Sequence, residues 1–148
     1  MIQEIKKLIF QTFSSQDCMG VFFSVFDNKG VLIRSNGVLE TDKTLDILLD
    51  LLYNGMIKPI ETNVSWIVFD FVKNLTVQSD INTFLKMSPK ETGVVLTSTQ
   101  DGKSGVLLPE TKGIENMQQA LACIKQKYQL AWNGIITTFT TTKITFQK

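Results

Sequence analysis

Hydrophobic side chains recur along the chain with two periods, one typical of amphipathic helices and one typical of strands. Apolar residues spaced three and four apart predict three helices, over residues 2–13, 44–53 and 114–128. Short runs rich in β-branched and aromatic residues predict strands. The predicted strands cover residues 20–26, 31–33, 63–72, 93–98, 104–108 and 135–146. Residues 73–91 show no clear period, so their structure and topology stay open.

Two turns join neighbouring strands into hairpins. Asp27-Asn28-Lys29-Gly30 follows the first predicted strand, and Asp101-Gly102 lies between the fourth and fifth. Ser35-Asn36-Gly37 carries the same turn chemistry and is predicted to end the second strand. Hairpin-joined strands interleaved with helices indicate an α+β fold. We expect a mainly antiparallel sheet with about three helices packed on it, with a small second lobe as a further possible feature.

Composition places the chain among folded globular domains. It has 148 residues, of which 43% are hydrophobic and 20% charged, the size of a single domain. Fifteen basic residues nearly cancel fourteen acidic ones, and the net charge of +1 argues against a dedicated nucleic-acid surface. Charged residues interrupt the first apolar positions, and no apolar run is long enough to span a membrane. We expect a cytoplasmic protein.

The absence of histidine restricts the chemistry that the chain can perform. Ser-His and Cys-His nucleophile systems and histidine-based zinc sites are excluded, which leaves carboxylates, lysines, hydroxyls and thiols. Cys18 and Cys123 have no metal-ligand spacing. Asp42, Asp46 and Asp50 recur every four residues, which predicts a solvated helical face and not a metal site. No cofactor or metal is predicted.

Four segments, taken in order, share a pattern with one known family. Residues 20–25, Gly-Val-Phe-Phe-Ser-Val, are similar to a Gly-Val-Phe-Val-Thr-Leu strand. Residues 32–40, Leu-Ile-Arg-Ser-Asn-Gly-Val-Leu-Glu, stand where that family carries Leu-Arg-Gly-Cys-Ile-Gly-Thr-Leu-Glu. Residues 103–110 are similar to an Arg-Gly-Leu-Leu-Leu-Pro segment, and residues 127–132 to a Lys-Ala-Gly-Leu step with a nearby tryptophan. In these segments the chain resembles the AMMECR family, over roughly its whole length (residues 1–148), as one domain.

Departures from the family pattern concentrate in residues 32–40. Ser35 stands at the family's cysteine position, Ile33 at its arginine and Arg34 at the glycine between them. An Asp-x-Arg-Phe segment, expected after the second helix, has no clear counterpart. The resemblance implies a diverged and shortened member. The family is associated with Memo-type and radical-SAM proteins, which implies a modification pathway without naming a substrate.

The resemblance also implies a candidate catalytic pair in this segment. Ser35 replaces the residue that would be the nucleophile, and its hydroxyl would need a base such as Glu40, Asp42 or a lysine. Glu40 and Asp42 could alternatively form an acid/base or Mg²⁺-binding pair. The competing interpretation is structural: the serine belongs to a turn and bonds local backbone, and the carboxylates complement the dipole of the following helix.

Three neighbouring residues are candidates for binding. Arg34 could hold a carboxylate or phosphate with two parallel hydrogen bonds, and Asn36 and Gly37 would shape the pocket wall. The competing interpretation makes Arg34 an exposed residue at the end of a strand.

Two functional hypotheses follow. The first is a non-catalytic binding or scaffold domain, with an unidentified protein or small molecule as partner, because the family's cysteine and arginine positions are both changed. The alternative is an enzyme or enzyme subunit that acts on a small molecule or a modified macromolecule through a pocket at residues 32–40.

Overall fold

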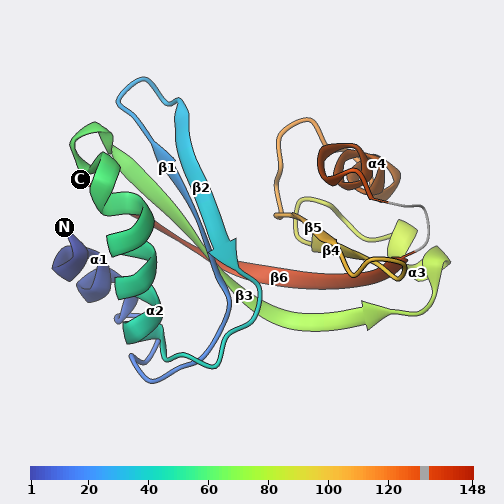
Figure 1. The fold of residues 1–148 in the computed structure, drawn as a ribbon, viewed down its shortest axis with the longest axis horizontal. Helices are drawn as coiled ribbons and strands as arrows, with labels where there is room; N and C mark the ends of the chain where they lie inside the picture. Colours follow the sequence, from blue (N-terminus) through green and yellow to red (C-terminus); the bar gives the residue numbers. More distant parts are fainter. Residues whose placement is uncertain (131–133) are drawn as a thin grey trace. The chain divides into compact units, whose positions relative to one another are not determined.

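The computed structural model describes residues 1–130 and 134–148, and it confirms the α+β fold and the antiparallel sheet. Within these residues six strands form one sheet in the order β2-β1-β3-β6-β4-β5 (Figure 1). The strands are β1 (Val21–Phe26), β2 (Leu32–Val38), β3 (Trp66–Gln78), β4 (Gly93–Ser98), β5 (Ser104–Leu107) and β6 (Gly134–Gln147). The α-helices are α1 (Ile2–Ile9), α2 (Leu45–Leu52), α3 (Ile81–Leu85) and α4 (Met117–Tyr128).

The chain divides into two compact units. The first contains Met1–Val72 and Thr142–Lys148, and the second contains Lys73–Thr141. The long strands β3 and β6 each pass from one unit into the other. Each unit has its own hydrophobic cluster.

In the first unit, helices α1 and α2 pack with β1 and the first part of β3 (Figure 1). Side chains of β1 alternate between buried and half-buried, as expected for a central strand between β2 and β3. The buried face of α2 consists of the four predicted leucines, Leu45, Leu48, Leu49 and Leu52. The helix then continues through a π-helical turn, η1 (Tyr53–Ile57), and a 3₁₀ segment, η2 (Lys58–Asn63).

Tyr53 in η1 is tied to η2 by its phenol. The side chain is only 6% exposed, and its hydroxyl donates a 2.6 Å hydrogen bond to Glu61 Oε2. Burial disfavours the phenolate, and the hydrogen bond and charge of Glu61 add to this effect, so the pKa of Tyr53 is raised to about 12.

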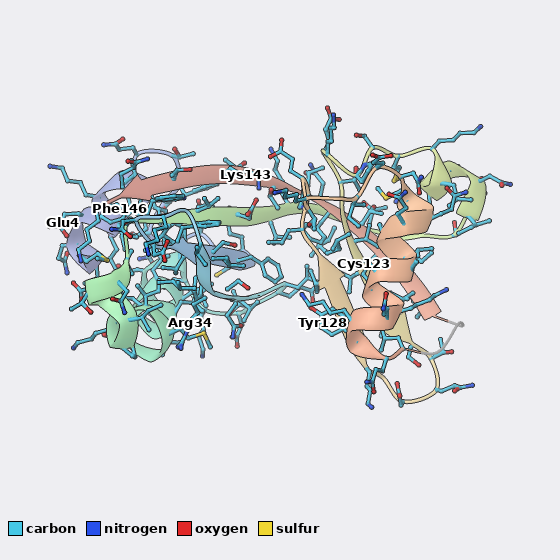
Figure 2. All side chains as sticks on the ribbon, turned by 90° about the horizontal axis from the view of Figure 1, so that it is seen from above. Glu4, Arg34, Cys123, Tyr128, Lys143 and Phe146 are labelled. Atoms are coloured by element: carbon cyan, nitrogen blue, oxygen red, sulfur yellow. The ribbon has the colours of Figure 1, made fainter. Side chains whose placement is uncertain are left out.

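In the second unit, α4 covers β4 and β5, with Phe84 of α3 in the same cluster. Asn116 caps α4 by accepting a 2.9 Å hydrogen bond from the backbone N–H of Gln119. Gln129 ends the helix in the left-handed region, with φ of 53°. Cys123 and Tyr128 both lie on α4 (Figure 2).

Residues 73–91, which show no clear hydrophobic period, form parts of β3 and α3 and the turns that follow. The first of these residues continue β3, the next form the short helix α3, and turns lead to β4. Side-chain hydrogen bonds join this part of β3 to β6, from Asn74 Nδ2 to Thr140 Oγ1 at 2.9 Å and from Gln78 Nε2 to Thr138 Oγ1 at 2.7 Å.

One predicted boundary is wrong in a way that matters for the site. Ser35-Asn36-Gly37 does not end the second strand, because β2 runs from Leu32 to Val38. All three residues pair with β1, opposite Ser24, Phe23 and Phe22 respectively. Backbone pairing with β1 therefore overrides the local turn preference of these residues.

Candidate functional site

The sequence-predicted site falls mostly on β2, the strand at one edge of the sheet. Directly opposed residues of an antiparallel pair share a face, and successive residues of a strand alternate between faces. Arg34 and Asn36 lie opposite Val25 and Phe23, whereas Ser35 lies opposite Ser24. The strand therefore places Ser35 on one face of the sheet and Arg34 with Asn36 on the other. The four residues 34–37 do not converge on one point.

A β-bulge interrupts the pairing just before these residues. Val25 pairs with Arg34 and Phe26 pairs with Leu32, which leaves Ile33 as the extra residue. Ile33 packs against the core of the first unit. Arg34 donates a hydrogen bond from Nη1 to the Met56 carbonyl at 3.3 Å, which holds the guanidinium toward the end of η1 (Figure 2).

Asn36 and Gly37 have local structural roles. Asn36 Oδ1 accepts a 2.6 Å hydrogen bond from the backbone N–H of Gly37. A β-carbon on Gly37 would collide with the Val21 carbonyl oxygen and would lie 2.6 Å from the Cα of Phe22. Close approach of the two backbones therefore requires glycine at this position.

Glu40 lies beyond the end of β2, in the segment that leads to α2, and its side chain is exposed. Asp42 follows in the same segment and is also exposed, and its carbonyl accepts a long 3.8 Å contact from Cys18 Sγ.

The other two aspartates of the predicted solvated face belong to an ion-pair cluster. Asp46 and Asp50 on α2 each lie 2.8 Å from Lys6 Nζ of α1. Burial alone would lower the pKa of Lys6, but the hydrogen bonds and charges of the two carboxylates outweigh it and raise that pKa. Both carboxylates remain about half exposed, at 46% and 47%. The cluster joins two helices, and the sequence pattern on α2 alone could not show its lysine.

The outer side of α2 carries an exposed apolar pair that lies outside the sequence-predicted site. Ile47 and Leu51, one helical turn apart, are 51% and 52% exposed. Six of the eight residues of α2 are apolar, which is more than a helix needs to cover one core face. That surplus was the signal available in the sequence.

A hollow of about 550 Å³ lies beside the β1–β2 turn and η2. Asp27, Lys29, Thr62 and Asn63 line it together with Ile33. The Asp27 carboxylate already accepts hydrogen bonds from the backbone N–H groups of Lys29 and Val31, at 2.8 and 2.9 Å. The hollow does not include Ser35 or Arg34 in its lining.

Residues 1–130 and 134–148 contain no cluster of three or more Cys, Asp or Glu side chains that could hold a metal ion. In the same residues no helix is both long and apolar enough to cross a membrane. Trp66 stacks on Phe26 with ring centroids 5.2 Å apart, which is a packing role, and Trp132 lies outside the described residues.

Comparison with known proteins informs the fold. No family model matches the chain, and no curated protein matches it. A crystal structure of the uncharacterised protein PH0010 from Pyrococcus horikoshii is similar, with a TM-score of 0.72 and 15% sequence identity. The match covers 88% of this chain and 75% of the other. At this level of identity the similarity shows a shared fold.

Proposed function

We propose that this chain is a diverged AMMECR-like domain that acts without catalysis, by binding a protein partner through the outer side of α2. The observation that carries the proposal is the exposed apolar pair of Ile47 and Leu51 on a helix whose opposite side is buried. The division of Ser35 from Arg34 and Asn36 between two faces of β2 supports a binding role over the enzyme alternative. A cytoplasmic setting suits the two free cysteines.

The pair is large enough to contribute measurably to an interface. Full burial of an isoleucine or leucine side chain contributes about 1.5–3 kcal/mol, and half of each side chain remains to be buried. Covering both would therefore stabilise a complex by about 2 kcal/mol, which is about a 30-fold change in Kd. Lys6 balances one of the two negative charges of Asp46 and Asp50 beside the pair, so the partner surface faces one net negative charge there.

The test compares two variants of the purified chain. A partner is captured with the wild-type protein, identified by mass spectrometry, purified, and titrated against each variant by calorimetry. Ile47→Ser/Leu51→Ser should weaken binding about 30-fold. Val77→Ser is the matched control, because Val77 is 64% exposed but belongs to the second unit, and it should bind like the wild type.

Thermal unfolding of both variants should stay close to the wild type, since surface substitutions usually change stability by less than about 0.5 kcal/mol. Equal loss of binding in the Val77 control, or full binding by the double variant, would rule out α2 as the contact. Turnover of a substrate by the chain, lost on Ser35→Ala, would favour the enzyme alternative instead.

A further inference from the structure

The second unit contains a hollow that is separate from α2 and from β2. Its volume is about 430 Å³, within the range of roughly 300–1,000 Å³ typical of small-molecule sites. Its lining comes from α3, β4, α4 and β6, which are distant in the sequence.

Aliphatic side chains form most of the wall. The four that line the hollow are Ile81, Leu96, Leu121 and Ile136. Leu96 is buried, Leu121 and Ile136 are half-buried, and Ile81 is 50% exposed. A surface that grades from buried to exposed aliphatic groups suits an apolar ligand chain with one end near solvent.

The hollow also has one cationic group, Lys125 of α4. The side chain is half-buried, and burial lowers the pKa of its ammonium because the charged form loses hydration. Its methylene stem can extend the apolar wall, with the charge at one end. Lys127, two residues further along the same helix, is exposed and lies 5.4 Å from the Tyr128 ring centroid.

We propose that this hollow binds a small molecule with one carboxylate and an aliphatic chain, the carboxylate against Lys125 and the chain against Leu96, Leu121 and Ile136. A carboxylate complements the positive charge that Lys125 brings to the hollow. A neutral ligand of the same length would contact the same aliphatic side chains without this charge complementarity, and the ammonium would repel an amine ligand. This site extends beyond the proposed function, since it uses a different unit from the partner-binding helix.

The first experiment titrates the purified full chain with octanoate, by calorimetry and by methyl NMR. Saturable binding is expected, with shifts concentrated on the methyl groups of Leu96, Leu121 and Ile136. Each methylene removed from the ligand should weaken binding by up to about fourfold, the equivalent of about 0.8 kcal/mol. 1-Octanol should bind at least about tenfold more weakly than octanoate, as expected for loss of a charge-assisted contact.

Two variants separate charge from shape. Lys125→Met keeps an unbranched apolar side chain and should reduce octanoate affinity to that of 1-octanol. Lys127→Met removes a neighbouring charge from the same helix and should leave octanoate affinity unchanged. Ile47→Ser/Leu51→Ser should also bind octanoate normally, so this site and the proposed partner site can fail independently.

The proposal would be overturned by non-saturable binding of octanoate, by shifts outside the hollow, or by an equal effect of Lys127→Met and Lys125→Met. Equal affinity for octanoate and 1-octanol would also reject it, because the carboxylate would then play no part.

Discussion

Gly37 offers the sharpest test of how β2 is held, because one added carbon meets backbone that cannot rotate away. In a Gly37→Ala variant the new β-carbon would collide with the Val21 carbonyl oxygen. It would also lie 2.6 Å from both Cα and Cδ1 of Phe22, where ordinary contacts begin near 3.4 Å. The edge strand would therefore have to move away from β1 by almost 1 Å at this point.

The expected loss of stability in Gly37→Ala is the cost of the collision less the gain from a stiffer unfolded chain. Overpacking in a well-packed region costs about 1–3 kcal/mol, and one weakened ladder hydrogen bond adds about 1 kcal/mol. Replacing glycine lowers the entropy of the unfolded chain, which returns about 0.4–1 kcal/mol. We expect a net loss of about 2 kcal/mol, or about 4–8 °C in Tm for a chain of this size.

Gly55→Ala is the matched control. Gly55 lies in η1, nothing lies within 4 Å of a β-carbon placed there, and its φ is outside the left-handed region. Alanine should therefore stabilise the protein, by about 0.5–1 kcal/mol. Circular dichroism gives the two Tm values, and hydrogen exchange shows whether the Gly37 variant loses protection in Val21–Phe26 and Leu32–Val38. A Gly37→Ala protein as stable as the wild type would refute the close-approach argument and return Gly37 to the binding candidates.

Three further predictions test other parts of the structure. With its pKa raised to about 12, Tyr53 should ionise above the ordinary tyrosine range, and stability should fall as pH rises from about 10, where the unfolded phenol ionises, to about 12. The part of the absorbance change at 295 nm that occurs near pH 12 should vanish in Tyr53→Phe. Lys143 Nζ lies 2.6 Å from Oδ1 of the buried Asp70, so Lys143→Met should lower the free energy of unfolding by about 2–3 kcal/mol. Adding Asp70→Asn should recover part of that loss in a double-mutant cycle, and purely additive losses would contradict pairing. Phe84 is fully buried in the cluster of the second unit, so Phe84→Ala should lower the free energy of unfolding by about 3–5 kcal/mol. Hydrogen exchange should show the loss of protection in α3 and α4, and a loss confined to α1 and α2 would contradict the division into two clusters.

The parts of the fold that could be predicted are those whose signal is local and repeated. The four buried leucines of α2 recur at helical spacing, and the apolar strands lie where their β-branched and aromatic runs lie. Helix α3 could not be found this way, because five residues with one buried side chain, Phe84, show no period. Its start depends on Asp80, whose side chain accepts a hydrogen bond from the backbone of Asn82.

The extension of β3 past Val72 could not be predicted from the sequence for a different reason. Residues 73–77 are all exposed, so no face is marked by burial. This part of β3 is held by side-chain hydrogen bonds to threonines of β6. Asn74 and Gln78 bond to threonines that lie 66 and 60 positions away in the chain. A partner at that distance cannot be identified from a local pattern. The same limit explains Ser35-Asn36-Gly37, where turn-forming residues were drawn into a strand by pairing with β1.

Whether a site can be read from the sequence depends on how many elements build it. Ile47 and Leu51 belong to one helix, and once four leucines are assigned to the core, the two remaining apolar positions identify an uncovered side. The hollow at Lys125 draws its walls from four elements, and each of its four aliphatic residues taken alone is an ordinary residue of a helix or strand. Only the fold brings those residues to one cation. Octanoate binding thus tests an arrangement that depends on tertiary structure, and the α2 variants test one already present in eight consecutive residues.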